Sequence, residues 1–257
     1  MSDAYPVTPP PTQDELPWED DQNMESERHR LQMELLIETL QPWLRQRTGG
    51  GYVGGNMFVY FSLAQIRRQD FRGPDVFVVL DVPPGERKCW VVWEEGKGPD
   101  VVIELLSAST AEDDKTRKKQ VYQSQLRAAE YYWYDPFEPE DFAGFAMQAG
   151  SYVPLQPDAG GDLHSPTLGL RLTRRAGSYR GTEAVWLRWL DDEDRVLPSS
   201  EELAVSAEQR ADSAEQRADS AEQRADSAEQ RAAVERERAE RLVARLRVLG
   251  VDPEADS

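Results

Sequence analysis

The chain has 257 residues, enough for one hydrophobic core of ordinary size with extensions at its ends. Its 30 basic and 48 acidic residues give a net charge of −18, which divides into −7 over residues 1–26, −5 over 27–200 and −6 over 201–257. The central segment is therefore only mildly acidic, and binding to nucleic acid would require a local basic patch.

The sequence argues against several classes of protein. Cys89 is the only cysteine, so no internal disulfide can form, and with only two histidines a structural zinc site is not expected. The acidic, proline-rich N-terminus does not resemble a signal peptide, and no apolar run approaches the ~18 residues of a membrane span. These features predict a soluble, cytoplasmic protein that does not contact membranes.

The N-terminal part of the chain changes character at Ser26. Residues 1–25 are rich in proline and acids and are predicted to be disordered. Residues 52–61 are predicted to form a strand, and residues 62–73 a loop or short helix. A helix is predicted directly after Ser26, because apolar residues recur at helical spacing at Leu31, Leu35, Ile37, Leu40 and Leu44.

The stretch PDVVIELLSASTAEDDKTRKKQVY, residues 99–122, has the strongest chemical character. Its short apolar run, residues 101–106, predicts a buried strand, in which Glu104 is costly to bury unless a partner or a metal ion offsets its charge. Ser109 lies three residues before Glu112, the spacing of a capping box that begins a helix.

One face of that helix is predicted to carry Asp114, Lys118 and Tyr122, which follow one another at four-residue steps. A strand carboxylate, a short loop and a helix lysine in this order indicate where the chemistry lies. The same residues also fit a plainer interpretation, in which Asp114 and Lys118 form an ordinary surface pair and Tyr122 packs in the core.

Other apolar segments predict strands before and after this stretch. They lie at residues 74–82, which include Asp75, at 89–93, at 130–135 and in several segments up to residue 190. The order of helix, strands, helix and strands predicts an α/β domain, with an α+β type of mixed sheet, over residues 26–200.

The C-terminal part contains a seven-residue repeat, SAEQRAD, which begins at residues 206, 213 and 220. Alanines recur in steps of four and three, and this pattern predicts a coiled-coil helix over residues 201–250, followed by a disordered tail at 251–257. In a parallel pair of helices, Arg217 faces Glu222 of the other chain. We therefore expect a homo-oligomer, most simply a parallel dimer through residues 206–249.

Four motifs of the sequence resemble the Uma-two family of bacterial endonucleases. They are GPDVFVV, PDVVIELLSAST, the helix with Asp114, Lys118 and Tyr122, and EYYWYDP. The resemblance covers roughly residues 26–190 and implies the PD-(D/E)XK restriction-endonuclease-like fold. It also implies that Asp75 and Glu104 bind Mg²⁺ or Mn²⁺ and that DNA is the substrate.

The sequence departs from the superfamily pattern at the strand lysine, because Leu106 occupies that position. The resemblance implies that Lys118 takes over the role of this lysine, with Lys119 as the alternative. Asp100 also follows a proline and is a weaker candidate for the metal-binding aspartate. Four strand residues, about 13 Å, separate it from Glu104, which is too far for the two acids to share one metal ion.

Basic residues flank the two acids in the sequence and are candidates for contacts with DNA, although a solvated charge run explains them equally well. They are Arg67, Arg68, Arg72, Lys115, Arg117 and Lys119. The sequence thus predicts a metal-dependent DNA endonuclease. The alternatives are an inactive nuclease fold that binds nucleic acid or acts as a scaffold, and an assembly protein whose function lies in the coiled coil.

Overall fold

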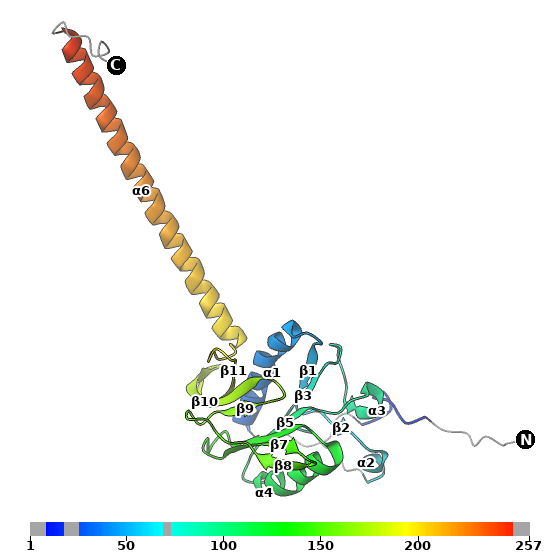
Figure 1. The fold of residues 1–257 in the computed structure, drawn as a ribbon. Helices are drawn as coiled ribbons and strands as arrows, with labels where there is room; N and C mark the ends of the chain where they lie inside the picture. The colour runs from blue at the N-terminus through cyan, green and yellow to red at the C-terminus, as the bar shows by residue number, and fades with distance from the viewer. Residues whose placement is uncertain (1–8, 18–25, 69–72, 249–257) are drawn as a thin grey trace, which may run out of the picture. The chain divides into compact units, whose positions relative to one another are not determined.

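The computed structural model describes residues 9–17, 26–68 and 73–248 (Figure 1). Contacts divide the chain after Ser200 into two compact units. The first unit contains three β-sheets and the helices that cover them, and the second consists of one long helix.

The largest sheet of the first unit has six strands in the order β1-β3-β5-β6-β7-β8. Strands β5 and β6 run parallel, and every other neighbouring pair is antiparallel. The prediction of a mixed sheet is confirmed. The strands are β1 (Gly51–Gly54), β3 (Val76–Leu80), β5 (Val101–Leu105), β6 (Glu130–Tyr134), β7 (Phe142–Gln148) and β8 (Ser151–Pro154).

The two faces of this sheet contact different elements because side chains alternate along each strand. On β3, Val76 and Val78 join the core beneath α1 (Glu27–Gln46), and Phe77 and Val79 join the core on the other face. The first core also receives a three-stranded sheet of β9 (Leu163–Ser165), β10 (Leu170–Tyr179) and β11 (Thr182–Leu190).

The second face is covered by the helix that follows β5, which changes winding along its length. It consists of α4 (Ala111–Asp113), the π-helical turn η1 (Asp114–Lys118), α5 (Lys119–Val121) and a second π turn, η2 (Tyr122–Leu126). The predicted capping box is wrong: the N-cap residue is Thr110, which makes no side-chain cap bond, and Ser107 Oγ accepts the Thr110 N–H at 3.3 Å.

Two predicted strands are shorter than expected. Residues 52–61 divide between β1 and β2 (Val59–Tyr60), because Asn56 has a positive φ of 47° and its N–H donates to the Pro74 carbonyl at 3.0 Å. Residues 89–93 divide between β4 (Trp90–Val91), which pairs with β2, and the turn of helix α3 (Val92–Glu95). The short helix α2 (Leu63–Arg68) lies where a loop or helix was predicted.

Gly55, at the break between β1 and β2, packs directly against the start of β3. A Cβ atom there would lie 2.2 Å from the backbone oxygen of Asp75 and 2.8 Å from Ile37 Cδ1. Only glycine allows this approach without movement of the backbone, so Gly55 helps to fix the position of Asp75.

Residues 9–17 belong to the segment that the sequence predicts to be disordered, yet in the structure they contact the β2–β4 region. Leu16 is buried, Trp93 Nε1 donates to the Pro11 carbonyl at 2.8 Å, and Tyr60 Oη donates to the Pro17 carbonyl at 2.6 Å. A leucine side chain and two indole or phenol hydrogen bonds therefore order this short segment.

The second unit is formed by α6 (Ser200–Val248), a continuous helix that contains the three SAEQRAD repeats and the related segment SAEQRAA, which begins at residue 227. Its apolar side chains Val234, Leu242 and Leu246 are exposed in the single chain. Among the described residues, no helix is both long enough and apolar enough to cross a membrane.

Candidate active site

Asp75 and Glu104 face each other on neighbouring strands. Val76 pairs with Ile103 in the antiparallel β3–β5 ladder, so the same register places Asp75, one residue before β3, opposite Glu104. Their carboxyl groups lie close enough that each shifts the pKa of the other. The structure thus brings together the two acids that the sequence predicts as a pair.

Each carboxylate is held by a specific donor. Asp75 Oδ2 accepts the backbone N–H of Leu105 at 2.7 Å, and Glu104 Oε1 accepts the hydroxyl of Tyr122 at 2.7 Å. Glu104 is fully buried, and its Oε2 lies 3.2 Å from Lys118 Nζ. These contacts fix the direction of both acids before any ligand binds.

Lys118 also pairs with a third acid, which lies one turn earlier on the same helix. Its Nζ is 2.6 Å from Asp114 Oδ1, and Asp114 is 1% exposed. Lys118 is therefore the cation that offsets two buried carboxylates, Glu104 and Asp114.

The π turns bring this row of side chains into line. In a regular α-helix, residues four apart are rotated by about 40° around the axis, so Tyr122 would point well away from Asp114. The wider turn of η1, which lies between Asp114 and Lys118, reduces that rotation. Asp114, Lys118 and Tyr122 consequently all approach Glu104, and π turns of this kind are frequent at functional sites.

Burial and mutual repulsion perturb the acids. Burial raises the pKa of Glu104 to about 7, against the opposing effect of Lys118, and the neighbouring Asp75 raises it further. Burial, followed by the charge of Glu104, raises the pKa of Asp114 to about 6. Burial also raises the pKa of Asp75, although the Leu105 N–H and Lys118 oppose the shift.

The two groups that donate to Glu104 remain protonated. Burial would lower the pKa of Lys118, but the carboxylates of Glu104 and Asp114 outweigh it, and the pKa is raised overall. Burial, and then the charge of Glu104, raise the pKa of Tyr122 well above its usual value. At neutral pH the site therefore contains three acids against one ammonium group.

The donor set suits a hard divalent cation. Within the described residues, no group of three or more histidine, cysteine or acidic side chains is arranged as a metal site. Mg²⁺ keeps several water ligands, however, and needs only one or two protein carboxylates together with substrate phosphates. The facing carboxylates of Asp75 and Glu104 meet that requirement. A bound cation would also relieve the repulsion between them.

Leu106, at the position of the superfamily's strand lysine, has an anchoring role. Its side chain is fully buried, and its carbonyl accepts a hydrogen bond from His29 Nε2 at 2.8 Å. Ser26 Oγ lies 2.7 Å from the other ring nitrogen of His29. The N-terminus of α1 is thereby fixed two residues beyond Glu104.

The basic residues predicted to contact DNA are placed unevenly. Lys115 Nζ pairs with Asp141 at 2.5 Å, and Lys119 Nζ lies 3.3 Å from the centre of the Phe145 ring. Neither lysine projects freely into solvent. Arg117 pairs with Asp113 on its own helix, the side chains of Arg67 and Arg68 on α2 lie outside the described residues, and so does Arg72.

Asp100, the weaker candidate, has a different function. Its Oδ2 accepts the Leu80 N–H at 2.7 Å and pairs with Lys97 Nζ at 2.8 Å. It precedes β5, whereas Glu104 lies near the other end of the same strand. Asp100 therefore links strands and is not part of the carboxylate pair.

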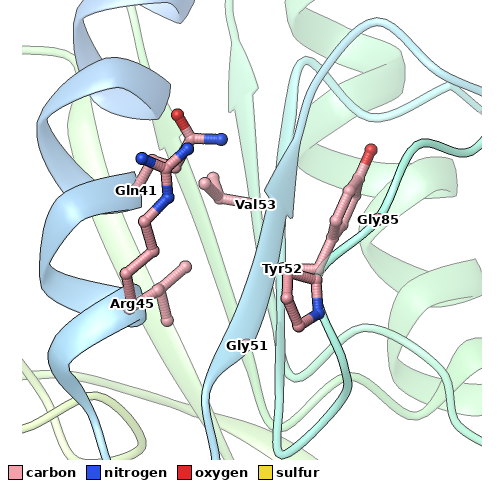
Figure 2. Close-up of a pocket in the computed structure, with 8 residues that line it drawn as sticks. Gln41, Arg45, Gly51, Tyr52, Val53 and Gly85 are labelled. Carbon is pink, nitrogen blue, oxygen red and sulfur yellow. The ribbon is translucent and has the colours of Figure 1, made fainter.

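A separate pocket of about 240 Å³ lies between α1 and the edge strand β1 (Figure 2). Gln41 and Arg45 line it from the helix, and Gly51 from the strand. Gly51 pairs with Leu80, at the end of β3 farthest from Asp75. The pocket and the carboxylate pair are thus distinct features.

A mixed sheet with helices on its faces, and an antiparallel strand pair that presents two acids, fits the restriction-endonuclease-like class of folds. The family model Uma2, described as "Putative restriction endonuclease", matches residues 21–176. The match spans more than half of the chain, and the chain belongs to the Uma2 family. No curated protein matches it.

Proposed function

We propose that this protein is a metal-dependent endonuclease that hydrolyses DNA phosphodiester bonds. The observation that carries the proposal is the register of β3 and β5, which sets Asp75 opposite Glu104 with both carboxyl groups oriented by donors. Membership of the Uma2 family supports the same class of reaction.

Asp75 and Glu104 would hold Mg²⁺ or Mn²⁺. When bound, such a cation lowers the pKa of a coordinated water molecule and stabilises the charge that develops on the scissile phosphate. The chain itself supplies the orientation: the Leu105 N–H holds Asp75, and the Tyr122 hydroxyl holds Glu104. Neither donor carries a charge that would compete with the cation.

Lys118 would place its ammonium group next to the reacting phosphate. It lies 3.2 Å from Glu104 and is held on the other side by Asp114 at 2.6 Å, so its position does not depend on Glu104 alone. A fixed ammonium group can orient the attacking water or neutralise developing negative charge. This supports the transfer of the lysine role from the strand to the helix.

The C-terminal helix would join two copies of the nuclease-like domain, residues 26–200, through residues 206–249 as a parallel dimer. Within residues 206–233, the arginines of the repeats form no ion pair with acids of their own helix. Arg224 and Arg231 each donate Nε–H to a carbonyl of their own helix, but no carboxylate of that helix pairs with them. In a parallel dimer each of these arginines and Arg217 would face a glutamate of the second chain, as Arg217 faces Glu222. We expect weak association, since alanine buries little area.

Cleavage of supercoiled plasmid DNA in Mg²⁺, in Mn²⁺ and in EDTA tests the proposal. Wild type should relax or linearise the plasmid only with a metal ion, and Asp75→Asn should abolish this activity. Asp100→Asn is the matched control, since it removes an acid beside the opposite end of β5, and it should retain activity. If wild type cuts the plasmid under none of the three conditions but binds DNA in EDTA, the protein is instead an inactive binding module.

A further inference from the structure

Phe137 is the one aromatic residue among the strongly exposed large apolar side chains of the described residues, with 51% of its surface accessible. It lies in the turn between β6 and β7, three residues after the end of β6. The guanidinium carbon of Arg28 lies 4.7 Å from the centre of its ring. The ring of His29 lies 5.7 Å away at an angle of 46°.

This pair lies at the same edge of the sheet as the two acids. Strands β5 and β6 are parallel, so their carboxyl ends meet at one edge, and Glu104 pairs with Trp133 there. The hydrogen bond from His29 to the Leu106 carbonyl ties the residue next to Arg28 to the end of β5. Phe137 and Glu104 thus lie at one edge of the sheet, with Phe137 against the start of α1 and the Glu104 side chain against the helix that follows β5.

Arg28 differs from its neighbours in its charge environment. Arg30, two residues along the same helix, pairs with Glu34 at 2.7 Å and Glu27 at 3.7 Å. Lys115 and Lys118 are paired with acids as well. In the part of the chain that the structure describes, no carboxylate lies within ion-pair distance of Arg28, although the chain as a whole is acidic.

We propose that Arg28 and Phe137 bind an unpaired stretch of the DNA strand that enters the carboxylate site, with a base stacked on the ring and a phosphate at the guanidinium. Every base has a π face, so stacking needs no particular sequence. A guanidinium that lies over a ring keeps its in-plane N–H donors available, and these match the oxygens of a phosphate. The inference rests on the proposed function, because it names the substrate of that site.

Fluorescence anisotropy of full-length protein with a labelled 20-nucleotide oligo(dT), in EDTA, measures this contact without cleavage. Phe137→Ala should weaken binding roughly 5- to 150-fold, the range that corresponds to about 1–3 kcal/mol of base stacking. Phe137→Tyr, which keeps the π face, should bind within about twofold of wild type. Arg28→Ala should weaken binding and also reduce its salt dependence.

Arg30→Ala is the matched control, since it removes the same charge from the same helix and should change binding less than about twofold. Equal losses in Arg28→Ala and Arg30→Ala, or wild-type binding by Phe137→Ala, would overturn the inference. The inference would also be overturned if wild type bound only duplex DNA, or if a lower melting temperature of the variants accounted for their loss of binding. If the variants lose binding but wild type never cuts plasmid, the inference stands and the proposed nuclease activity fails.

Discussion

Replacement of Glu104 by glutamine should change how stability depends on pH. The side chain is fully buried, and its pKa in the folded protein is raised from 4.5 to about 7. Between these values the folded state binds more protons than the unfolded state, so the free energy of unfolding falls as the pH rises. Below pH 4.5 both states are protonated, and this contribution disappears.

The size of the effect follows from the same shift. A pKa raised to this extent lowers the free energy of unfolding by roughly 3 kcal/mol above pH 7. Glu104→Gln keeps the shape and an oxygen that can accept the Tyr122 hydroxyl, but it does not ionise. The variant should therefore match wild type near pH 4.5 and exceed it at pH 8, by roughly 6–12 °C in melting temperature for a domain of this size.

Thermal unfolding from pH 4.5 to 8 in EDTA measures this difference. Glu112→Gln is the control, because it removes an exposed charge at the start of the same helix and should leave the slope of wild type unchanged. Added Mg²⁺ at pH 8 should raise the melting temperature of wild type more than that of Glu104→Gln. Parallel curves for wild type and Glu104→Gln would refute the view that Glu104 is a strained, buried carboxylate.

Three further results are expected. Lys118→Ala should lower plasmid cleavage far more than Lys119→Ala, and equal modest losses would remove the special role of Lys118. Gly55→Ala should cost about 1–3 kcal/mol of stability and displace Asp75, because a Cβ atom would lie 2.2 Å from a backbone oxygen; an unchanged denaturation midpoint would contradict this. Light scattering should find dimers of the full chain at tens of micromolar and monomers of a chain that ends at Ser200, and monomers of both would exclude the coiled coil.

The sequence was most informative about the strands and the acids on them. Strand alternation and a β-branched apolar run located β3 and β5, and the resemblance to a family then selected Asp75 and Glu104. Their juxtaposition follows from an antiparallel register, which a single sequence does not specify. The four-residue spacing also identified the helix face that carries Lys118 and Tyr122.

Other features depend on tertiary contacts with no sequence signal. The sequence left open whether Asp114 belongs to the site or to an ordinary surface pair, and its packing against the sheet leaves it only 1% exposed. The π turns, the contact of Gly55 with Asp75 and the hydrogen bond of His29 to Leu106 all join residues distant in sequence or depart from regular geometry. Residues 9–17 appeared too polar to pack, but Leu16 finds a small apolar cluster.

The binding of Mn²⁺ to the intact chain, measured by isothermal titration at pH 7.5, tests most directly whether the carboxylate pair is a cation site. Wild type should bind Mn²⁺ at a site that Asp75→Asn loses and Asp100→Asn keeps, because only Asp75 faces Glu104. Superimposable titrations of wild type and Asp75→Asn would contradict the account, since they would show that the facing acids do not hold the metal.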